Sequence, residues 1–222
     1  MIMLVRTFKL SVLSIILAAA LVSSFTGNGN AQNIYPKKDL VFSQVVAGPG
    51  FDSSIAVTNR GTYTYEGSMI FTSGENGAAW NPIVNGTRVV SGTREVTIEP
   101  DQTMVYYVKE TSLKAGYVVF LSIDWSIDNH IEGNLTYFSY DGTGVQDAVG
   151  VPESKEFRIA SLPYSNFYDV GLSLANPDLY ELGAAEVQVL LFYQDGELAT
   201  GCTLELASDA HLSRFLSELP WT

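Results

Sequence analysis

The sequence contains one cysteine, two histidines and few basic residues, and each scarcity argues against a class of structure or site. Cys202 alone cannot form an intrachain disulfide. The two histidines, His130 and His211, lie far apart and do not have zinc-ligand spacing. Twelve Lys and Arg residues against 24 Asp and Glu give a net charge of −12. We therefore expect no basic face for nucleic acid, because phosphate contacts need clustered cations.

Long hydrophobic runs are also scarce, and the one candidate lies at the N-terminus. Residues 1–31 start with basic Arg6 and Lys9, continue with an apolar stretch and end in small residues up to Ala31. This order is typical of a secretory signal peptide. The apolar stretch is interrupted by serines and is shorter than the ~20 residues of a spanning helix, which disfavours the alternative of an uncleaved anchor. We expect cleavage near Ala31, a secreted, periplasmic or cell-surface protein, and no stable membrane insertion afterwards.

The remaining sequence reads as short strands joined by turns, in two similar halves. Residues 54–77 and 170–196 both follow the order strand, Asn turn, loop, strand and Gly turn. Alternation of apolar and polar residues is typical of half-buried strands. The aligned pairs are Phe42 with Phe157, Ile55 with Leu172, Asn59 with Asn176, Gly77 with Gly196, and Ile98 with Leu206. The pattern predicts an all-β protein of two antiparallel immunoglobulin-like β-sandwich units.

We expect four segments along the chain: the signal peptide (1–31), a polar segment (32–38), unit 1 (39–150) and unit 2 (151–222). Unit 1 continues beyond the equivalent of unit 2's last strand with two strong strand candidates, residues 117–124 and 131–140, which have no counterpart in unit 2. Unit 2 is therefore predicted to be incomplete, with open sheet edges. These edges could pack on unit 1, be completed by partner strands or by more chain, or support self-association.

A short helix is predicted near the C-terminus. Asp209 is a suitable N-cap residue, and Pro220 would stop the helix. Leu212, Phe215, Leu216 and Leu219 fall at helical spacing, so that one apolar stripe would face the domain.

Four stretches of unit 2 carry a resemblance to a known module: VGVPES at 149–154, DVGLSLANP at 169–177, QVLLFYQDGE at 188–197 and HLSRFLSELP at 211–220. They resemble an uncharacterised secreted bacterial β-sandwich-like repeat module with the pattern "GVP-S … LANP … Y-DG … HLARFLSELF". The resemblance covers most of the exported chain and is specific from about Gly150. It implies export and a β-sandwich-like fold, and no catalytic residue is carried over, because the module has none assigned.

No catalytic constellation stands out, and we expect a protein that is not an enzyme. No G-x-S-x-G elbow surrounds any serine. His130 and His211 are interpreted as solvated or capping residues, one in each unit. Cys202 shares a strand face with Leu204 and Leu206, so its thiol is predicted to be buried rather than reactive.

Two ligand sites remain as hypotheses. Asp124, Asp128 and Glu132 lie close together in the sequence and could bind calcium through oxygen ligands, although such residues also form ordinary turns. No other cofactor is expected. Tyr63, Tyr65 and Trp80 could form an aromatic platform for a glycan, since flat rings stack on sugars; the alternative is that they cover sandwich faces.

Three functions follow from these features. The first is a secreted non-enzymatic structural, adhesion or interaction protein that acts through β-sandwich loops and edges on a protein or polysaccharide at the cell exterior. The second is a glycan-binding module using the exposed aromatic residues. The third is a carboxylate-dependent hydrolase, for which the sequence selects no pair of acids.

Overall fold

Strands make up nearly all of the regular structure. The computed structural model describes residues 3–4, 16–20, 38–123, 130–141, 143–154, 163–164, 171–177, 183–193 and 195–221. In these ranges the one helical element is a 3-10 turn, η1 (Leu216–Glu218). None of their helical residues forms a segment long and apolar enough to cross a membrane. The all-β prediction is confirmed.

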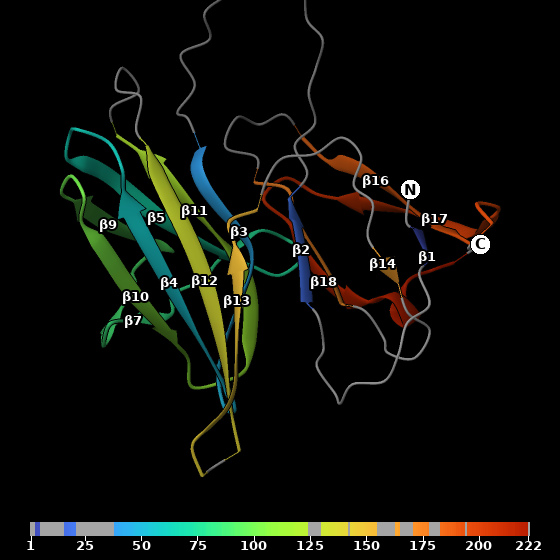
Figure 1. Ribbon diagram of the computed structural model, residues 1–222, viewed down its shortest axis with the longest axis horizontal. Helices are drawn as coiled ribbons and strands as arrows, with labels where there is room; N and C mark the ends of the chain where they lie inside the picture. Colours follow the sequence, from blue (N-terminus) through green and yellow to red (C-terminus); the bar gives the residue numbers. More distant parts are fainter. Residues whose placement is uncertain are drawn as a thin grey trace, which may run out of the picture.

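Unit 1 forms two antiparallel sheets that face each other (Figure 1). Its strands are β3 (Lys38–Ala47), β4 (Phe51–Asn59), β5 (Tyr65–Ser73), β6 (Ala78–Ala79), β7 (Ile83–Val84), β8 (Thr87–Arg88), β9 (Thr93–Ile98), β10 (Thr103–Lys109), β11 (Lys114–Ser122), β12 (Ile131–Tyr140) and β13 (Val145–Pro152). One sheet has the order β13-β12-β4-β10-β7-β8. The other has the order β3-β11-β5-β6, and β9 also pairs with β5. The arrangement is that of a β-sandwich.

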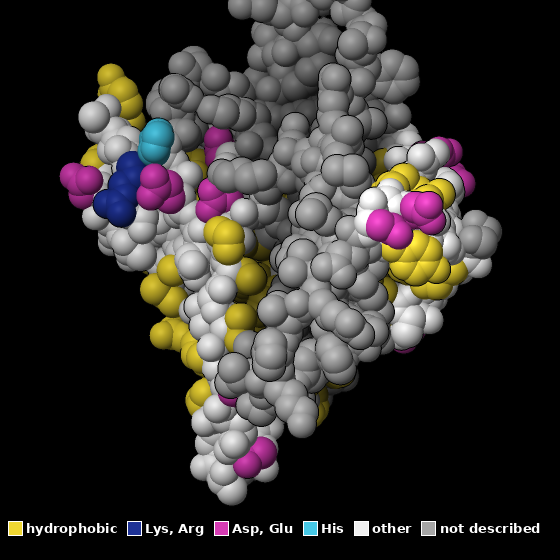
Figure 2. All heavy atoms as spheres, turned by 45° about the vertical axis from the view of Figure 1, so that its right-hand side comes forward, with side chains coloured by type: hydrophobic (Ala, Val, Ile, Leu, Met, Phe, Trp, Pro, Cys, Tyr) yellow, Lys and Arg dark blue, Asp and Glu magenta, His cyan; other side chains and the backbone are white. Residues whose placement is uncertain are grey.

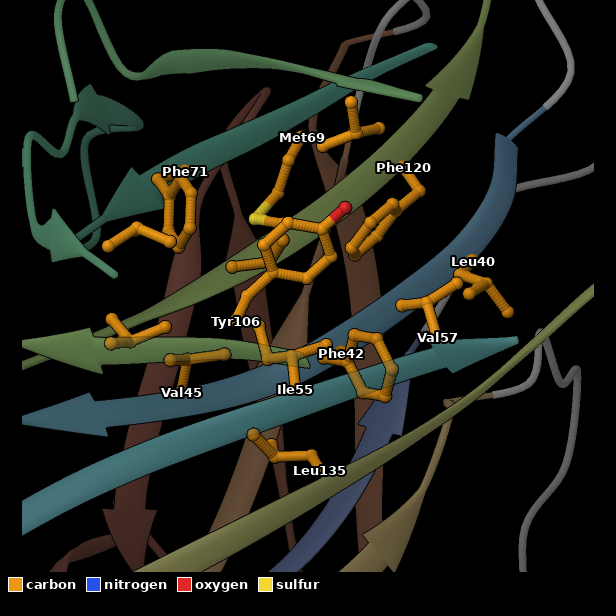
Figure 3. Close-up of a cluster of buried hydrophobic side chains, with 14 of the residues drawn as sticks. Leu40, Phe42, Val45, Ile55, Val57, Met69, Phe71, Tyr106, Phe120 and Leu135 are labelled. Carbon is orange, nitrogen blue, oxygen red and sulfur yellow. The ribbon is translucent and has the colours of Figure 1, made fainter. Parts of the chain in front are cut away.

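The core of unit 1 lies between these two sheets and is rich in aromatic rings. Ile55 on β4 and Leu135 on β12 contribute from one sheet, and Phe42 on β3 and Phe120 on β11 from the other. Figure 3 shows the ring of Tyr106 within this cluster. The ring centroid of Phe120 lies 6.3 Å from that of Phe42 and 6.2 Å from that of Tyr106. These distances fall in the range of favourable aromatic pairs.

β13 was not expected as a strand. It pairs with β12 along its length, so that unit 1 extends to Pro152, past the boundary expected at residue 150. Ser154 continues the connection, because its backbone N–H donates to the Val41 carbonyl of β3 at 2.7 Å. The side chains of β13 are mostly exposed. Its sequence therefore lacks the alternation that reveals a half-buried strand.

Unit 2 is smaller and includes strands from the predicted signal peptide. Its strands are β14 (Pro163–Tyr164), β15 (Gly171–Ala175), β16 (Ala185–Phe192), β17 (Leu198–Leu206) and β18 (His211–Phe215), together with β1 (Met3–Leu4) and β2 (Ile16–Ala20). β16 and β17 form an antiparallel hairpin, and β15 lies between β18 and β2. β1 and β2 run parallel to β14 and β15. Phe157, which was aligned with Phe42, lies outside the described residues.

The predicted C-terminal helix is wrong. His211 to Phe215 form strand β18, which pairs antiparallel with β15, and only the 3-10 turn η1 follows. Leu212, Leu216 and Leu219 are buried in the core of unit 2, but Phe215 is exposed. A strand followed by a tight turn buries three of the four residues of the apparent stripe. Pairing with β15 therefore overrides the helical spacing, which is a weak preference in a short segment.

Two strand pairs of unit 2 have counterparts in unit 1 with the same register. In unit 1, Ile55 of β4 is opposite Tyr106 of β10; in unit 2, the aligned Leu172 of β15 is opposite Arg214 of β18. β9 pairs with β5 as β17 pairs with β16, with Ile98 opposite Tyr65 and Leu206 opposite Ala185. β15, β16, β17 and β18 are thus the counterparts of β4, β5, β9 and β10.

A buried asparagine marks each unit at the same point. Asn59 Nδ2 donates to the Ile98 carbonyl at 2.9 Å, and Asn176 Nδ2 donates to the Leu206 carbonyl at 3.2 Å. Asn59 was aligned with Asn176, and Ile98 with Leu206, from the sequence alone. Three residues after each accepting carbonyl, Asp101 and Asp209 adopt positive φ angles of 59° and 57°. The predicted similarity of the two halves is confirmed at these positions.

Candidate functional site

The predicted glycan platform is not formed by Tyr63, Tyr65 and Trp80. Tyr63 is 66% exposed, whereas Tyr65 is fully buried and Trp80 is 1% exposed. Trp80 packs edge-on against Phe71 with ring centroids 5.9 Å apart. Tyr65 donates to Asp39 Oδ2 at 3.2 Å, and burial raises the pKa of its phenol. Tyr65 and Trp80 are therefore core residues. The prediction failed because an aromatic ring in a loop or at the start of a strand can turn inward as easily as outward.

The predicted calcium ligands are only partly within the described residues. Asp124 and Asp128 lie outside them. Glu132 is exposed on β12, with Oε2 3.4 Å from Arg60 Nε and Oε1 3.8 Å from His130 Nε2. Across the described residues, no three His, Cys, Asp or Glu side chains gather as a metal site would require. Glu132 thus takes part in an exposed ion pair, and calcium binding stays a prediction.

The two histidines differ, and only one expectation is correct. His130 is exposed, as expected of a solvated residue. His211 is 3% exposed and lies at the start of β18 rather than at a helix terminus, so its prediction as a solvated or capping residue is wrong. Cys202 is buried with Leu204 and Leu206 in the core of unit 2, as predicted, and burial raises the pKa of its thiol.

His211 belongs to a buried polar cluster where β3 of unit 1 meets β15 and β18 of unit 2. Gln44 Oε1 lies 2.9 Å from His211 Nε2 and 2.8 Å from Ser173 Oγ. Ser173 Oγ is also 2.8 Å from the Ser43 carbonyl oxygen and 3.2 Å from His211 Nε2. With an amide oxygen as its acceptor, Nε2 carries the hydrogen of a neutral ring. Burial lowers the pKa of His211 to about 4, against a smaller opposing effect of a hydrogen bond with Ser43.

This cluster is a structural joint rather than a nucleophile and base. Ser173 and His211 are within hydrogen-bonding distance, but Ser173 is fully buried and no substrate can reach its hydroxyl. The neighbour of the imidazole is the neutral amide of Gln44, which cannot stabilise an imidazolium as a carboxylate does. A buried polar group is costly unless it is hydrogen-bonded, so these contacts fix how the units pack.

Further contacts surround the cluster on both sides. Tyr117 Oη donates to Asp209 Oδ1 at 3.3 Å, and Arg214 Nη2 is 2.6 Å from Glu75 Oε1. The His211 backbone N–H donates to the carbonyl of Gly74 at 3.0 Å. Val41, Val119 and Ala175 form a small apolar cluster with Tyr117. The outer face of β3 and β11 is therefore the surface on which unit 2 packs.

Several exposed apolar and aromatic residues lie on the outer face of the six-stranded sheet. Val105 and Tyr107 alternate along β10 with the buried Tyr106 and Val108, so they point away from the core. Tyr107 is 53% exposed. Because Tyr107 is opposite Ser54 on β4, and Ser54 is opposite Thr136 on β12, this face is continuous across three strands. Figure 2 shows hydrophobic side chains on unit 1 above the tip of the β12–β13 hairpin.

β12 adds two rings and a polar group to this face. Phe138 is partly exposed and lies opposite Asp52, and Tyr140 is 37% exposed. Asp52 Oδ2 is 3.1 Å from Lys109 Nζ. Burial and a hydrogen bond to Asp52 raise the pKa of Tyr140. We call the surface made by Val105, Tyr107, Phe138 and Tyr140 the aromatic band.

Sequence reasoning missed the aromatic band. The signal was present, because β10 carries apolar residues at both inward and outward positions. A strand at the surface of an antiparallel sheet normally alternates apolar and polar residues. Apolar Val105 and Tyr107 on the outward face break this alternation and indicate a covered or binding surface. Comparisons with protein-family models, with curated proteins and with solved structures found no match to this chain.

Proposed function

We propose that the chain is an exported, non-enzymatic structural, adhesion or interaction protein, built from two immunoglobulin-like units, that binds its partner at the cell exterior through the aromatic band. The observation that carries the proposal is the exposure of Tyr107, Val105 and Tyr140 on one sheet face. Exposed apolar surface with a polar rim is typical of interaction sites, and tyrosine is enriched in them.

The non-enzymatic part of the proposal has separate support. The described histidines supply no accessible general base paired with a nucleophile, since His211 is buried against Gln44 and Ser173 where the two units pack together. His130 lies at the exposed end of β12 beside Glu132. These positions suit structure and solubility rather than acid–base catalysis.

A glycan is the second candidate ligand, and a specific observation favours it. The rings of Tyr107, Phe138 and Tyr140 lie on the same face of the sheet as the ion pair of Asp52 and Lys109. Sugars present apolar C–H faces and hydroxyl groups, so rings flanked by hydrogen-bonding groups suit both parts of the molecule. The residues of this candidate differ from the predicted Tyr63, Tyr65 and Trp80.

The test compares Tyr107→Ala with Tyr63→Ala, which removes a more exposed tyrosine outside the band. Binding to a panel of insoluble and soluble polysaccharides and self-association by light scattering are measured for both variants and the parent protein. We expect Tyr107→Ala to weaken the observed binding about tenfold, the size of one lost aromatic contact of about 1.4 kcal/mol. Tyr63→Ala should leave it unchanged. Equal loss in both variants, or none in Tyr107→Ala, contradicts a role of the band.

Export is tested separately. N-terminal sequencing of protein recovered from outside the producing cells should begin at about residue 32. Intact residues 1–31 on the mature protein would contradict the proposed leader cleavage without affecting the binding experiment.

A further inference from the structure

Two Asn-Gly dipeptides lie in the described part of the chain, Asn76 with Gly77 and Asn85 with Gly86. In such a pair the side-chain amide is open to attack by the backbone nitrogen of the glycine, because glycine carries no side chain that shields this nitrogen and its backbone bends freely. Both pairs form hairpin turns, the first between β5 and β6 and the second between β7 and β8, and both asparagines are exposed. The two pairs share this chemistry and differ in how the asparagine is held.

Asn85 is fixed against β10. Its Nδ2 donates to the Val105 carbonyl at 3.0 Å, and its Oδ1 accepts from the Tyr107 backbone N–H at 2.7 Å. Its own backbone N–H donates to the Tyr107 carbonyl at 3.0 Å. Ring closure would turn the side-chain amide toward the nitrogen of Gly86 and break both of its hydrogen bonds to β10. The fold therefore protects Asn85 from this reaction.

Asn76 is not held in this way. Its side chain is exposed, and its amide has no hydrogen-bonding partner among the described residues. The attacking nitrogen belongs to Gly77, whose N–H makes only a long hydrogen bond to the Gly74 carbonyl, at 3.5 Å. Both reacting groups of this pair are thus free to approach each other in the folded protein.

The loop that carries Asn76, residues 74–77, is part of the contact between the two units. The Gly74 carbonyl accepts a hydrogen bond from the His211 backbone N–H at 3.0 Å. Glu75 Oε1 lies 2.6 Å from Arg214 Nη2. Both contacts join the β5–β6 loop of unit 1 to β18 of unit 2. A chemical change at Asn76 therefore takes place next to the residues that hold unit 2 in position.

The close packing of Gly77 makes this loop sensitive to such a change. A Cβ added to Gly77 would lie 2.9 Å from the Cβ of Asp209, and the φ angle of Gly77 is 67°. An isoaspartate at position 76 adds one atom to the backbone just before Gly77, and this position has no space for a displaced chain. The new carboxylate also adds a negative charge to a loop that already contains Glu75 and packs on Asp209, where like charges repel.

We propose that Asn76 deamidates spontaneously in the folded protein, and that the isoaspartate product weakens the packing of unit 2 on unit 1. The Gly77 nitrogen forms a bond with Asn76 Cγ and gives up its proton. The bond between Cγ and Nδ2 breaks, and Nδ2 takes up a proton and leaves as ammonia. Water then opens the resulting succinimide. Addition of water at Cγ gives aspartate, and addition at the main-chain carbonyl carbon gives isoaspartate; water is the one co-reactant.

The test compares the two asparagines within one protein. The full-length chain is incubated at mildly alkaline pH, once folded and once in denaturant, and peptide mass spectrometry that distinguishes isoaspartate from aspartate follows both sites. In the folded protein we expect Asn76 to convert at least about tenfold faster than Asn85, a difference of about 1.4 kcal/mol in activation free energy. In denaturant the two rates should converge, because neither turn is formed.

The effect on the contact between the units is measured by amide hydrogen exchange of single residues. The His211 N–H, which donates to Gly74, should exchange at least about tenfold faster in protein converted at Asn76 than in fresh protein. The Tyr107 N–H, which donates to Asn85, should not change. The variant Asn76→Gln, incubated in parallel, is the matched control. Its longer side chain closes a ring far more slowly, so the His211 N–H should stay protected.

Three results overturn the proposal. Conversion of Asn76 that is no faster than that of Asn85 in the folded protein means that the loop does not permit ring closure. A rate difference that persists in denaturant means that sequence neighbours, and not the fold, select Asn76. Unchanged exchange of the His211 N–H after conversion, or an equal increase in Asn76→Gln, means that residue 76 does not control the contact between the units. No ligand is used, so these results are independent of binding at the aromatic band.

Discussion

Acidification should weaken the joint between the two units through His211. The ring is neutral in the folded protein, where burial holds its pKa at about 4, and titrates near 6.5 when exposed in the unfolded chain. Its contacts Gln44, Ser173 and Tyr117 are uncharged and offer no counter-ion to the protonated ring. Between these two values the unfolded chain binds the proton and the folded chain does not. The free energy of unfolding therefore falls as the pH is lowered through this window.

The size of the effect follows from the shift. Each pH unit within the window costs about 1.4 kcal/mol, so the stability lost through His211 is about 2 kcal/mol at pH 5 and about 3 kcal/mol at pH 4 and below. Above about pH 6.5 its contribution to stability is fully present. For a domain pair of ordinary stability, about 5–15 kcal/mol, this is a substantial fraction.

Denaturant unfolding at a series of pH values between about 7.5 and about 4 measures the stability lost through His211. The comparison is between the parent protein, His211→Gln and the control His130→Gln, which alters the exposed histidine. The carboxylates titrate equally in all three proteins, so the difference between the slopes of unfolding free energy against pH isolates His211. We expect the stability of His211→Gln to fall less steeply by about 1.4 kcal/mol per pH unit at most, and His130→Gln to follow the parent. Parallel curves for the parent and His211→Gln would refute the reasoning.

Three further predictions concern stability and reactivity. Asn176→Ala and Asn59→Ala should each lower the free energy of unfolding by about 1–3 kcal/mol, because each side-chain amide donates to buried backbone carbonyls. Denaturant unfolding checks both variants, and unchanged midpoints would contradict this prediction. Trp80→Ala should cost about 3–5 kcal/mol by the same assay yet leave polysaccharide binding per folded molecule unchanged, and selective loss of binding would restore the predicted platform. Cys202 should resist a thiol reagent until denaturant is added, and rapid labelling of the native protein would contradict its burial.

The sequence predicts the strands best where one face is buried and the other is polar. β4 and β16 alternate in this way, and they overlap the stretches 54–77 and 170–196 in which strands were predicted. β13 is exposed along most of its length and carries no such signal. The helix predicted for the C-terminal residues was wrong for another reason. Leu212, Leu216 and Leu219 are buried by a strand and a turn, and their spacing also fits a helix.

The candidate site was harder to predict than the fold. Whether an aromatic residue is a core residue or a binding residue depends on contacts far away in the sequence. Trp80, in a loop, is covered by Phe71 and by a carboxylate of Glu110, 3.4 Å from its Nε1. His211 is buried only because unit 2 packs on β3, a contact between residues 167 positions apart. Such contacts leave no local pattern in the sequence. The apolar residues at the outward positions of β10, by contrast, are visible in the sequence as a break in the alternation.

The identical register of the two units also has a consequence for how the chain reaches its native state. β4 and β15 present matching edges, and β10 and β18 present matching partners, so each strand could pair with the wrong counterpart without a register shift. Exchange between similar repeats is a common route to misassembly. The side chains oppose the exchange. His211 fits against Gln44 and Ser173, whereas Thr103, its counterpart on β10, bonds Thr58 Oγ1 at 2.8 Å. The polar contacts at the start of each strand thus help each half select its own partner during folding.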